Sequence, residues 1–327
     1  MVMTSARFNL VQPGVEPNEM SDRYRAMLDM VELMDRSGMT MVSLEEHHGA
    51  PDVWSPAPLA TAGLIFGRAR NMGITISAVL VPLHDPLRLA EDIAVLDLAS
   101  GGRLVVVAGL GYRPEEYVAH RKDWSRRGQL FDEALDAMLA AWTGEPFEYH
   151  GATIRVTPRP FTQPHPTLLI GGTSRISARR AARYGLPFFP AANMPELEAY
   201  YYEQCAAQGR DGFCMMPSDH TTMIMVAEDP DKAWAEIGQY LFHEAHTYAG
   251  WQTPDIRSAV HSHATSVDEL RAERMYQILS PEECIDHVKE GGEAAAVMIH
   301  PLCGGMPIDK GWECVHLFVE QVLPALV

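Results

Sequence analysis

Short apolar runs alternate with longer amphipathic stretches along the whole chain. The apolar run at 73–81 is continuous, as expected for a strand buried on both faces. Residues 21–36 instead place Met27, Val31 and Met34 on one side at helical spacing, with Gly38 just beyond the end. The same reasoning predicts eight strands, at 8–11, 39–44, 73–81, 103–108, 167–170, 186–189, 221–226 and 295–300.

A helix is predicted after each strand, including helices at 127–142 and 231–241, and several helix starts carry a local signature. Ser55-Pro56, Asp85-Pro86 and Ser280-Pro281 each combine a capping residue with a proline at the first helical position. Eight β-then-α units in 327 residues predict an α/β protein, a (β/α)8 TIM barrel with insertions, in one domain over 1–327. The rival is a doubly wound open sheet, which usually has fewer strands. No glycine-rich dinucleotide fingerprint follows the first strand.

Two segments are predicted to be insertions. Residues 145–158 contain an alternating pattern about His150-Gly151, which is typical of a β-hairpin. Residues 243–279 separate the seventh and eighth units and mix polar, histidine and aromatic residues. On a barrel such a long excursion is often an active-site lid, and a surface arm or a dimer contact is the alternative.

Charge and composition narrow the possible partners. With 26 Lys and Arg against 43 Asp and Glu, the formal charge is −17, which disfavours nucleic acid and anionic membranes. A small-molecule partner is expected instead. The amino-terminal residues precede no long apolar run, so neither a signal peptide nor a membrane span is predicted. The five cysteines, an odd number, have no metal-binding or redox spacing, which favours a cytoplasmic protein.

Candidate chemistry follows the second strand, where Glu45, Glu46, His47 and His48 come directly after an apolar run. In parallel α/β folds the carboxyl ends of the strands are where ligands bind. Buried ionisable groups are costly unless they are paired or used, so this segment is a candidate catalytic site. A solvated polar loop is the alternative.

Further candidates follow other strands. Small residues at Ser77 and Ala78 would let a flat ligand approach the backbone, and the fourth strand ends in Gly109, Gly111 and Tyr112. The fifth strand ends in Gly171, Gly172, Thr173 and Ser174, followed by Arg175. Glycines, hydroxyls and free amides at a helix start can bind phosphate. An ordinary tight turn with a serine cap is the alternative.

Taken together and in order, these motifs resemble the bacterial-luciferase-like flavin-dependent oxidoreductases. The resemblance rests on 44–48, 86–97, 101–103, 109–117, 171–174 and 181–187, and it covers nearly the whole chain. It implies a (β/α)8 barrel that binds reduced FMN or a deazaflavin coenzyme and forms a homodimer or larger assembly. It also implies that His47 acts beside the flavin, that Ser174 holds the cofactor phosphate, and that a non-prolyl cis peptide lies at or near Ser77-Ala78.

The resulting hypothesis is a flavin-dependent monooxygenase that uses reduced FMN, supplied by a separate reductase, and dioxygen to oxidise a small organic substrate. His47 would exchange protons and Glu46 or a neighbour would orient it. His48, Trp54 and His300 are candidate pocket residues. Three alternatives stay open: hydride transfer with a deazaflavin, a metal-dependent hydrolase using His47, His48, His84, His300 and Glu46, and a flavin-binding protein without activity.

Overall fold

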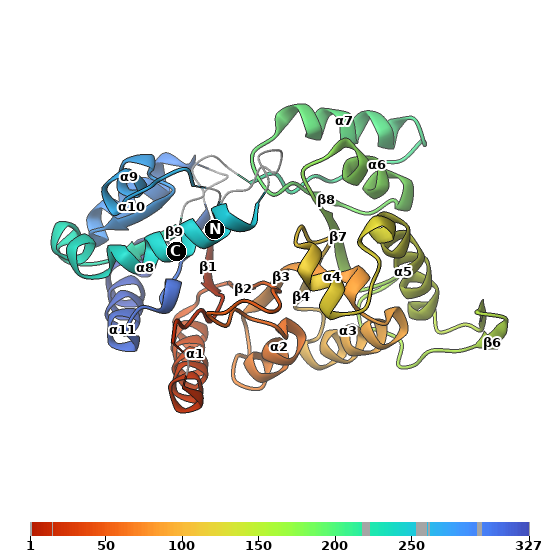
Figure 1. The fold of residues 1–327 in the computed structure, drawn as a ribbon, viewed down its shortest axis with the longest axis horizontal. Coiled ribbons are helices and arrows are strands. Elements are labelled where there is room, and N and C mark those ends of the chain that lie inside the picture. The colour runs from red at the N-terminus through yellow and green to blue at the C-terminus, as the bar shows by residue number, and fades with distance from the viewer. Residues whose placement is uncertain are drawn as a thin grey trace.

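Nine parallel strands form the main sheet of the computed structural model (Figure 1), which describes residues 2–14, 16–217, 223–252, 260, 262–292 and 296–326. The strands are β1 (Met3–Phe8), β2 (Met41–Leu44), β3 (Gly73–Leu80), β4 (Leu104–Gly109), β7 (Thr167–Gly171), β8 (Phe188–Phe189), β9 (Met223–Val226), β10 (Tyr276–Leu279) and β11 (Ala296–Ile299). Their order is β10-β9-β11-β1-β2-β3-β4-β7-β8. Without β10, this is the order of a (β/α)8 barrel, which confirms the predicted fold class. Within the described residues, no ladder joins β8 to β10.

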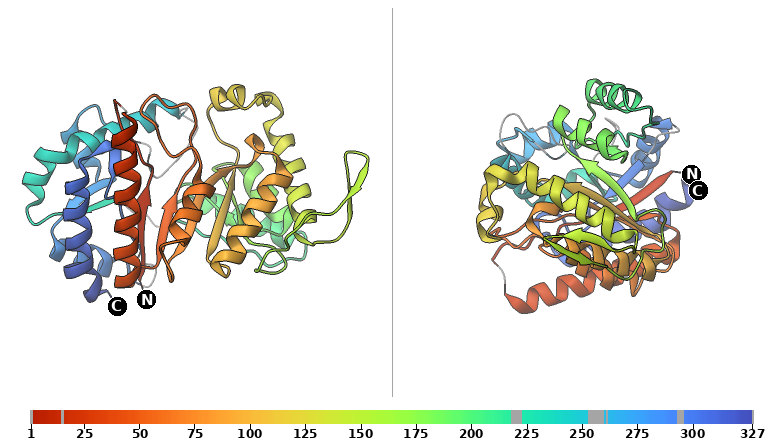
Figure 2. Two further views of the ribbon diagram at one scale, coloured as in Figure 1. Left: turned by 90° about the horizontal axis from the view of Figure 1, so that it is seen from below. Right: turned by 90° about the vertical axis from the view of Figure 1, so that its right-hand side faces the viewer.

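Helices surround the sheet in chain order (Figures 1 and 2). They are α1 (Pro17–Ser37), α2 (Pro58–Phe66), α3 (Pro86–Ser100), α4 (Pro114–Ala119), α5 (Arg127–Trp142), α6 (Arg175–Tyr184), α7 (Pro195–Ala206), α8 (Pro230–Trp251), α9 (Val267–Glu273), α10 (Pro281–Glu290) and α11 (Ile308–Leu317). Helix α1 packs against α2 and α11, α2 against α3, α3 against α5, and α6 against α7. No helix in the described part of the chain combines the length and the apolar character that crossing a membrane requires.

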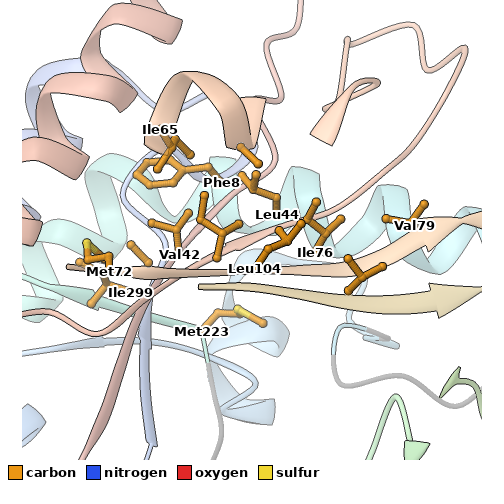
Figure 3. Close-up of a cluster of buried hydrophobic side chains, with 14 of the residues drawn as sticks. Phe8, Val42, Leu44, Ile65, Met72, Ile76, Val79, Leu104, Met223 and Ile299 are labelled. Atoms are coloured by element: carbon orange, nitrogen blue, oxygen red, sulfur yellow. The ribbon is translucent and has the colours of Figure 1, made fainter. Parts of the chain in front are cut away.

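Alternate residues of each strand face opposite sides. Ala6 and Phe8 of β1, Val42 and Leu44 of β2, and Ile74 and Ile76 of β3 are buried between the strands and the helices (Figure 3). The residues between them face the barrel interior, and many are polar: Ser5, Arg7, Ser43, Glu45, Thr75 and Ser77. The barrel interior is therefore polar along β1, β2 and β3, and the candidate residues His47 and Ser77 lie at the ends of β2 and β3.

The predicted hairpin is confirmed, whereas the predicted position of the first strand and the predicted start of the second helix need correction. Strands β5 (Phe147–Tyr149) and β6 (Ala152–Ile154) pair antiparallel and project from the body (Figure 2). The first strand was predicted at 8–11 but lies earlier, because its inward residues Ser5 and Arg7 conceal its apolar alternation. The second helix begins at Pro58 rather than at Ser55-Pro56, since Ser55 is buried and its carbonyl accepts a hydrogen bond from the His47 amide.

The predicted 243–279 insertion is not a single excursion, and its role as a lid stays a prediction. Residues 243–251 are the last turns of α8, which runs ten residues beyond the predicted end at 241, and 276–279 form β10 beside β9. The segment thus contributes a helix end, α9 and a strand. Residues 253–259 and 261, which also belonged to this prediction, and residues 221, 222 and 295, predicted as strand ends, lie outside the described residues.

Candidate active site

The segment after β2 sends its side chains alternately to two sides. Glu45 faces the barrel interior, where its Oε2 accepts hydrogen bonds from Arg7 Nε (3.1 Å) and Nη2 (2.6 Å). Glu46 faces the other way and accepts from the Leu80 amide (2.6 Å), and its Oε1 lies 2.9 Å from His48 Nε2 and 2.7 Å from His84 Nε2. Two consecutive carboxylates therefore belong to two different clusters.

His47 lies between these clusters inside a shell of aromatic rings. The side chain of His47 is 9% exposed. The ring centroids of Trp54, Tyr112, Tyr248 and Trp251 lie 5.4, 6.0, 5.6 and 5.1 Å from the imidazole centroid. Trp54 is itself held in place by a hydrogen bond from its Nε1 to Asp52 (3.0 Å). Such a shell excludes water from the imidazole.

The polar neighbours of His47 differ from those expected. Glu46 or a neighbour was predicted to orient the ring, and the Glu46 oxygens contact His48, His84 and the Leu80 amide instead. His47 Nε2 lies 3.3 Å from the Tyr248 hydroxyl, and Nδ1 lies 3.7 Å from Glu116 Oε1. The sequence places Glu46 next to His47, but the alternation of side chains turns it away.

Helix α4, which the sequence pattern did not predict, supplies Glu116. Its Oε1 accepts hydrogen bonds from the His48 amide (3.0 Å) and from Arg113 Nη1 (3.3 Å). The Arg113 guanidinium also stacks over the Trp251 ring at 4.2 Å. This six-residue helix thereby connects the loop after β4 to the segment after β2 and to the end of α8.

Burial and hydrogen bonding set the charge of Glu46 and His84. Burial opposes ionisation of Glu46, but hydrogen bonds from His48, His84 and the Leu80 amide outweigh it and lower the pKa to about 2. Burial likewise lowers the pKa of His84, but the hydrogen bond and charge of Glu46 raise it overall. We call Glu46, His48 and His84 the rim cluster; their side chains are 0%, 15% and 31% exposed.

A second cluster is fully internal and centres on Glu244 of α8. Arg7 Nη1 donates to Glu244 Oε1 (2.7 Å), and Nη2 donates to the Tyr248 hydroxyl (2.8 Å). Glu244 also receives hydrogen bonds from Asn9, from Tyr276 (3.0 Å) and from Cys303 (3.1 Å), while His300 Nε2 lies 3.0 Å from its Oε2. We call this the interior cluster; its members are Arg7, Asn9, Glu45, Glu244, Tyr248, Tyr276, His300 and Cys303.

Opposite charges keep Glu244 and Arg7 of the interior cluster ionised. Burial favours the neutral form of Glu244, yet His300 and Arg7 hold its pKa well below the usual range. Burial lowers the pKa of Arg7, but Glu45 and its other neighbours raise it well above its usual value. Buried ions of this kind are stable only when each is paired and hydrogen-bonded.

The structure separates the histidines that a metal-dependent hydrolase would use. His48 and His84 lie in the rim cluster, and His300 lies in the interior cluster. Within the described part of the chain, the one group close enough to share an ion is Glu244, His300 and Cys303. That group excludes His47, His48 and His84, so these residues do not converge on one point. His300 is fully buried against Glu244, and its predicted pocket role stays a prediction.

Strand β3 ends in the non-prolyl cis peptide that the family resemblance implies. The Ser77-Ala78 peptide is cis and does not involve proline. The ladder to β4 shifts register between Ser77 and Val79, so Ala78 is left out of it. A Cβ on Gly109 would lie 2.7 Å from the Ala78 Cβ, which explains a glycine at this position. The side chains of Ser77 and Ala78 are half-buried at the end of the barrel.

The turn after β7 starts helix α6. Gly172 has φ +144°, and a Cβ there would lie 2.6 Å from Ser177 Oγ. Ser174 is the N-cap and forms a capping box with Ser177. Ser174 and Arg175 are exposed, and the Arg175 guanidinium lies over the Tyr200 ring at 4.8 Å. The first amides of a helix lack intrahelical partners, so this exposed turn can donate to an anion.

His47 and Ser174 follow strands that are three positions apart in the sheet, β2 and β7. At a strand spacing of about 4.8 Å, this corresponds to about 14 Å along the sheet. The cis peptide at the end of β3 and Gly109 at the end of β4 lie between them. A flat ring with a phosphorylated tail has the dimensions to span this row of strand ends.

Comparisons with known proteins identify the family of this chain. A family model described as luciferase-like monooxygenase matches residues 3–297. The chain belongs to the luciferase-like monooxygenase family. The chain spans 51% and 66% of the length of the first curated relatives that it matches.

Other relatives match over a larger share of this chain. The alkanal monooxygenase beta chain of Vibrio harveyi is 24% identical over 310 residues, which are 90% of this chain and 88% of the relative. The crystal structure of monooxygenase RslO1 from Streptomyces bottropensis superposes with a TM-score of 0.78 at 25% identity, with both chains fully covered.

Two more distant structures share the fold. The oxygenating constituent of 3,6-diketocamphane monooxygenase from Pseudomonas putida, in complex with FMN, has a TM-score of 0.71 at 17% identity, with 99% of each chain covered. An F420-dependent secondary alcohol dehydrogenase has a TM-score of 0.66, also at 17% identity, and is covered over 99% of its length and 100% of this chain.

Sequence reasoning missed several residues around His47. Arg7, Glu116, Glu244 and Tyr248 were not singled out. Arg7 carried a usable signal, because an arginine facing the interior of an otherwise uncharged strand requires a buried partner. Glu244 and Tyr248 carried none, since they lie on a helix whose length the sequence underestimated.

Proposed function

We propose that this luciferase-like protein is a flavin-dependent monooxygenase that oxidises a small organic substrate with reduced FMN and dioxygen. The observation that carries the proposal is the row of features along neighbouring strand ends. His47 follows β2, the Ser77-Ala78 peptide ends β3, Gly109 ends β4, and the capped turn of α6 follows β7.

The residues present fit such a cofactor. The exposed α6 turn, with Thr173, Ser174 and Arg175, would hold the phosphate. Gly171 and Gly172 keep that turn free of side chains, and a Cβ on Gly171 would lie 2.8 Å from Val107 Cγ1. Ser77, Ala78 and Gly109, with Gly111 and Tyr112 in the next turn, would lie against the ring. Reduced FMN supplies the electrons with which dioxygen is activated.

His47 is the residue we propose for proton transfer. An imidazole can give or take a proton near neutral pH. The four aromatic rings around His47 keep bulk water from it, so the proton would be exchanged with reactants rather than with solvent. Glu116 and Tyr248, rather than Glu46, are the polar groups that orient the ring.

The binding test distinguishes the proposed phosphate turn at Ser174 from the residues proposed to contact the flavin ring. Purified protein is titrated with FMN, riboflavin and F420, and binding is followed by fluorescence. Ser174→Ala is expected to weaken FMN binding and leave riboflavin binding unchanged, because riboflavin has no phosphate. Ser280→Ala is the matched control, since Ser280 has the same capping box at α10, away from this turn. Equal losses for FMN and riboflavin would remove Ser174 from the phosphate site.

The activity test uses His47→Ala. We expect FMN to remain bound while turnover falls by about 10²- to 10⁴-fold, the range that a positioned acid–base group contributes. Reoxidation of the reduced flavin by dioxygen, followed by absorbance, reports oxygen reactivity without knowledge of the substrate. Unchanged turnover in the variant would exclude His47 from the mechanism.

A deazaflavin dehydrogenase is the second candidate, and the F420-dependent alcohol dehydrogenase of the same fold favours keeping it. The same titration decides between them. Tight F420 binding without oxygen-dependent turnover would replace the monooxygenase proposal with hydride transfer.

We further propose a homo-oligomer that receives its flavin from a separate reductase in the cytoplasm. Leu64 of α2 and Val95 and Leu98 of α3 are 52%, 51% and 43% exposed on adjacent helices, which provides an apolar surface for a second copy. All five cysteines are free and buried, as is usual in a reducing compartment. Light scattering on the purified protein would show the number of copies.

A further inference from the structure

The Tyr248 hydroxyl lies between two groups that constrain its single hydrogen. Arg7 Nη2 lies 2.8 Å from the hydroxyl oxygen, and a guanidinium can only donate. The Tyr248 oxygen therefore accepts from Arg7, and its hydrogen remains available for another acceptor. His47 Nε2 lies 3.3 Å away on the other side.

The opposite edge of the imidazole faces a carboxylate. Glu116 Oε1 lies 3.7 Å from His47 Nδ1, and a carboxylate favours an N–H at that position. Of the other charged groups near His47, Glu46 contacts His48, His84 and the Leu80 amide. Glu45 Oε2 accepts from Arg7, while Glu45 Oε1 is buried without a hydrogen-bond partner among the described residues. The remaining neighbours are the rings of Trp54, Tyr112 and Trp251.

We propose that Tyr248 is a positioning residue that fixes neutral His47 in the tautomer with its hydrogen on Nδ1. The Tyr248 hydroxyl donates to Nε2, so Nε2 must carry the lone pair and Nδ1 the hydrogen. Nδ1 is buried and has no hydrogen-bond partner among the described residues. The Nδ1–H is therefore the group that His47 can offer as a hydrogen-bond donor to a bound reactant, while Tyr248 holds Nε2. This last consequence rests on the proposed function, whereas the tautomer itself does not.

The interior cluster makes this arrangement rigid. Tyr248 is carried by α8, whose Glu244 is held one turn earlier by Arg7, Tyr276 and Cys303. Burial, and next the charge of Glu45, raise the pKa of Tyr248 well above its usual value. The hydroxyl thus keeps its hydrogen at any working pH and remains a donor to His47.

The tautomer can be measured directly, without flavin or substrate. Imidazole ¹⁵N shifts distinguish a protonated from an unprotonated ring nitrogen, and His47→Gln assigns the signal by its disappearance. In the wild-type protein we expect hydrogen on Nδ1. In Tyr248→Phe, we expect the population to shift toward hydrogen on Nε2. Tyr276→Phe is the matched control, because it removes a phenolic hydroxyl from Glu244 without touching His47.

Each outcome has a definite meaning. Hydrogen on Nε2 in the wild-type protein would overturn the proposal, and this measurement needs no variant to fold. An unchanged tautomer in folded Tyr248→Phe, or the same change in Tyr276→Phe, would also overturn it.

Kinetics then test the consequence. Tyr248→Phe should lower kcat by about 10- to 100-fold with an unchanged FMN dissociation constant and KM. A confirmed tautomer without a kinetic effect would leave Tyr248 as the positioning residue and instead refute proton transfer by His47.

Discussion

Glu45 and Glu46 are adjacent in the chain, yet they belong to clusters of different kinds. Glu45 joins the interior cluster, whose other members come from β1, α8, β10 and the segments after β1 and β11. Glu46 joins the rim cluster, whose members come from the segments after β2 and after β3.

The two clusters differ both in burial and in how far apart their members lie in the sequence. The rim cluster lies within 40 residues of chain and leaves His84 partly exposed. The interior cluster joins residues more than 200 positions apart and has no access to water at Glu244. An ion without water depends entirely on its protein partners, so the two clusters should respond differently to the loss of one member.

The largest effect is expected for Arg7→Met. This change leaves Glu45 and Glu244 buried without their cation, and we expect the free energy of unfolding to fall by about 3–5 kcal/mol at pH 7. Uncompensated buried carboxylates take up protons. The difference from wild type should therefore shrink as pH falls from 7 to 5 in chemical denaturation. A difference that grows over this range would contradict our account of the interior cluster.

A pair of isosteric changes compares the clusters directly. Glu244→Gln should lower the free energy of unfolding by about 2–3 kcal/mol, because several buried donors lose a charged acceptor. Glu46→Gln should cost less, about 1–2 kcal/mol, since His48 and His84 can turn to water. Denaturant midpoints at pH 7 measure both. Equal costs would mean that burial does not separate the two clusters.

The rim cluster should also make stability depend on pH. The pKa of His84 is raised in the folded protein, so its contribution is complete below 6.5 and is lost as pH rises through the folded pKa. The pKa of Glu46 is lowered to about 2, so its contribution is present above 4.5 and is lost only in strong acid.

His84→Gln should accordingly flatten the decline in melting temperature as pH rises above 6.5. His316→Gln is the control, because His316 pairs with Glu320 on an exposed helix face. If His84→Gln and His316→Gln both keep the wild-type decline in melting temperature with rising pH, a group other than His84 causes that decline.

The smallest effect is expected for Cys303→Ser. Burial raises the pKa of this thiol well above its usual value, so it is neutral and donates to Glu244. A serine hydroxyl can make the same hydrogen bond, and the free energy of unfolding should change by less than about 1 kcal/mol. Cys303→Ala removes the donor and should cost more. A large loss for serine would show that the sulfur has another role.

Local chemistry explains which parts of the fold were predictable. Helix α5 begins and ends where its pattern predicted, and the caps at Asp85 and Ser280 are present, because a cap depends on residues three positions apart. The hairpin at His150-Gly151 also needs only its own residues. The first strand was displaced because its inward side is polar, and polar residues in strands become interpretable only once their partners are known.

The candidate site also has parts that could be predicted from the sequence and parts that could not. The barrel, the segment carrying His47 and the glycine turn at Ser174 could be predicted from the sequence, because each depends on contiguous residues and on the rule that parallel strands present their carboxyl ends together. The surroundings of His47 could not be predicted and became visible only in the folded chain. Folding turned Glu46 away and brought in Glu116, Tyr248 and Arg7 from distant segments. The physical reason is that a buried charge or imidazole is defined by the groups that replace its water, and the chain order does not specify those groups.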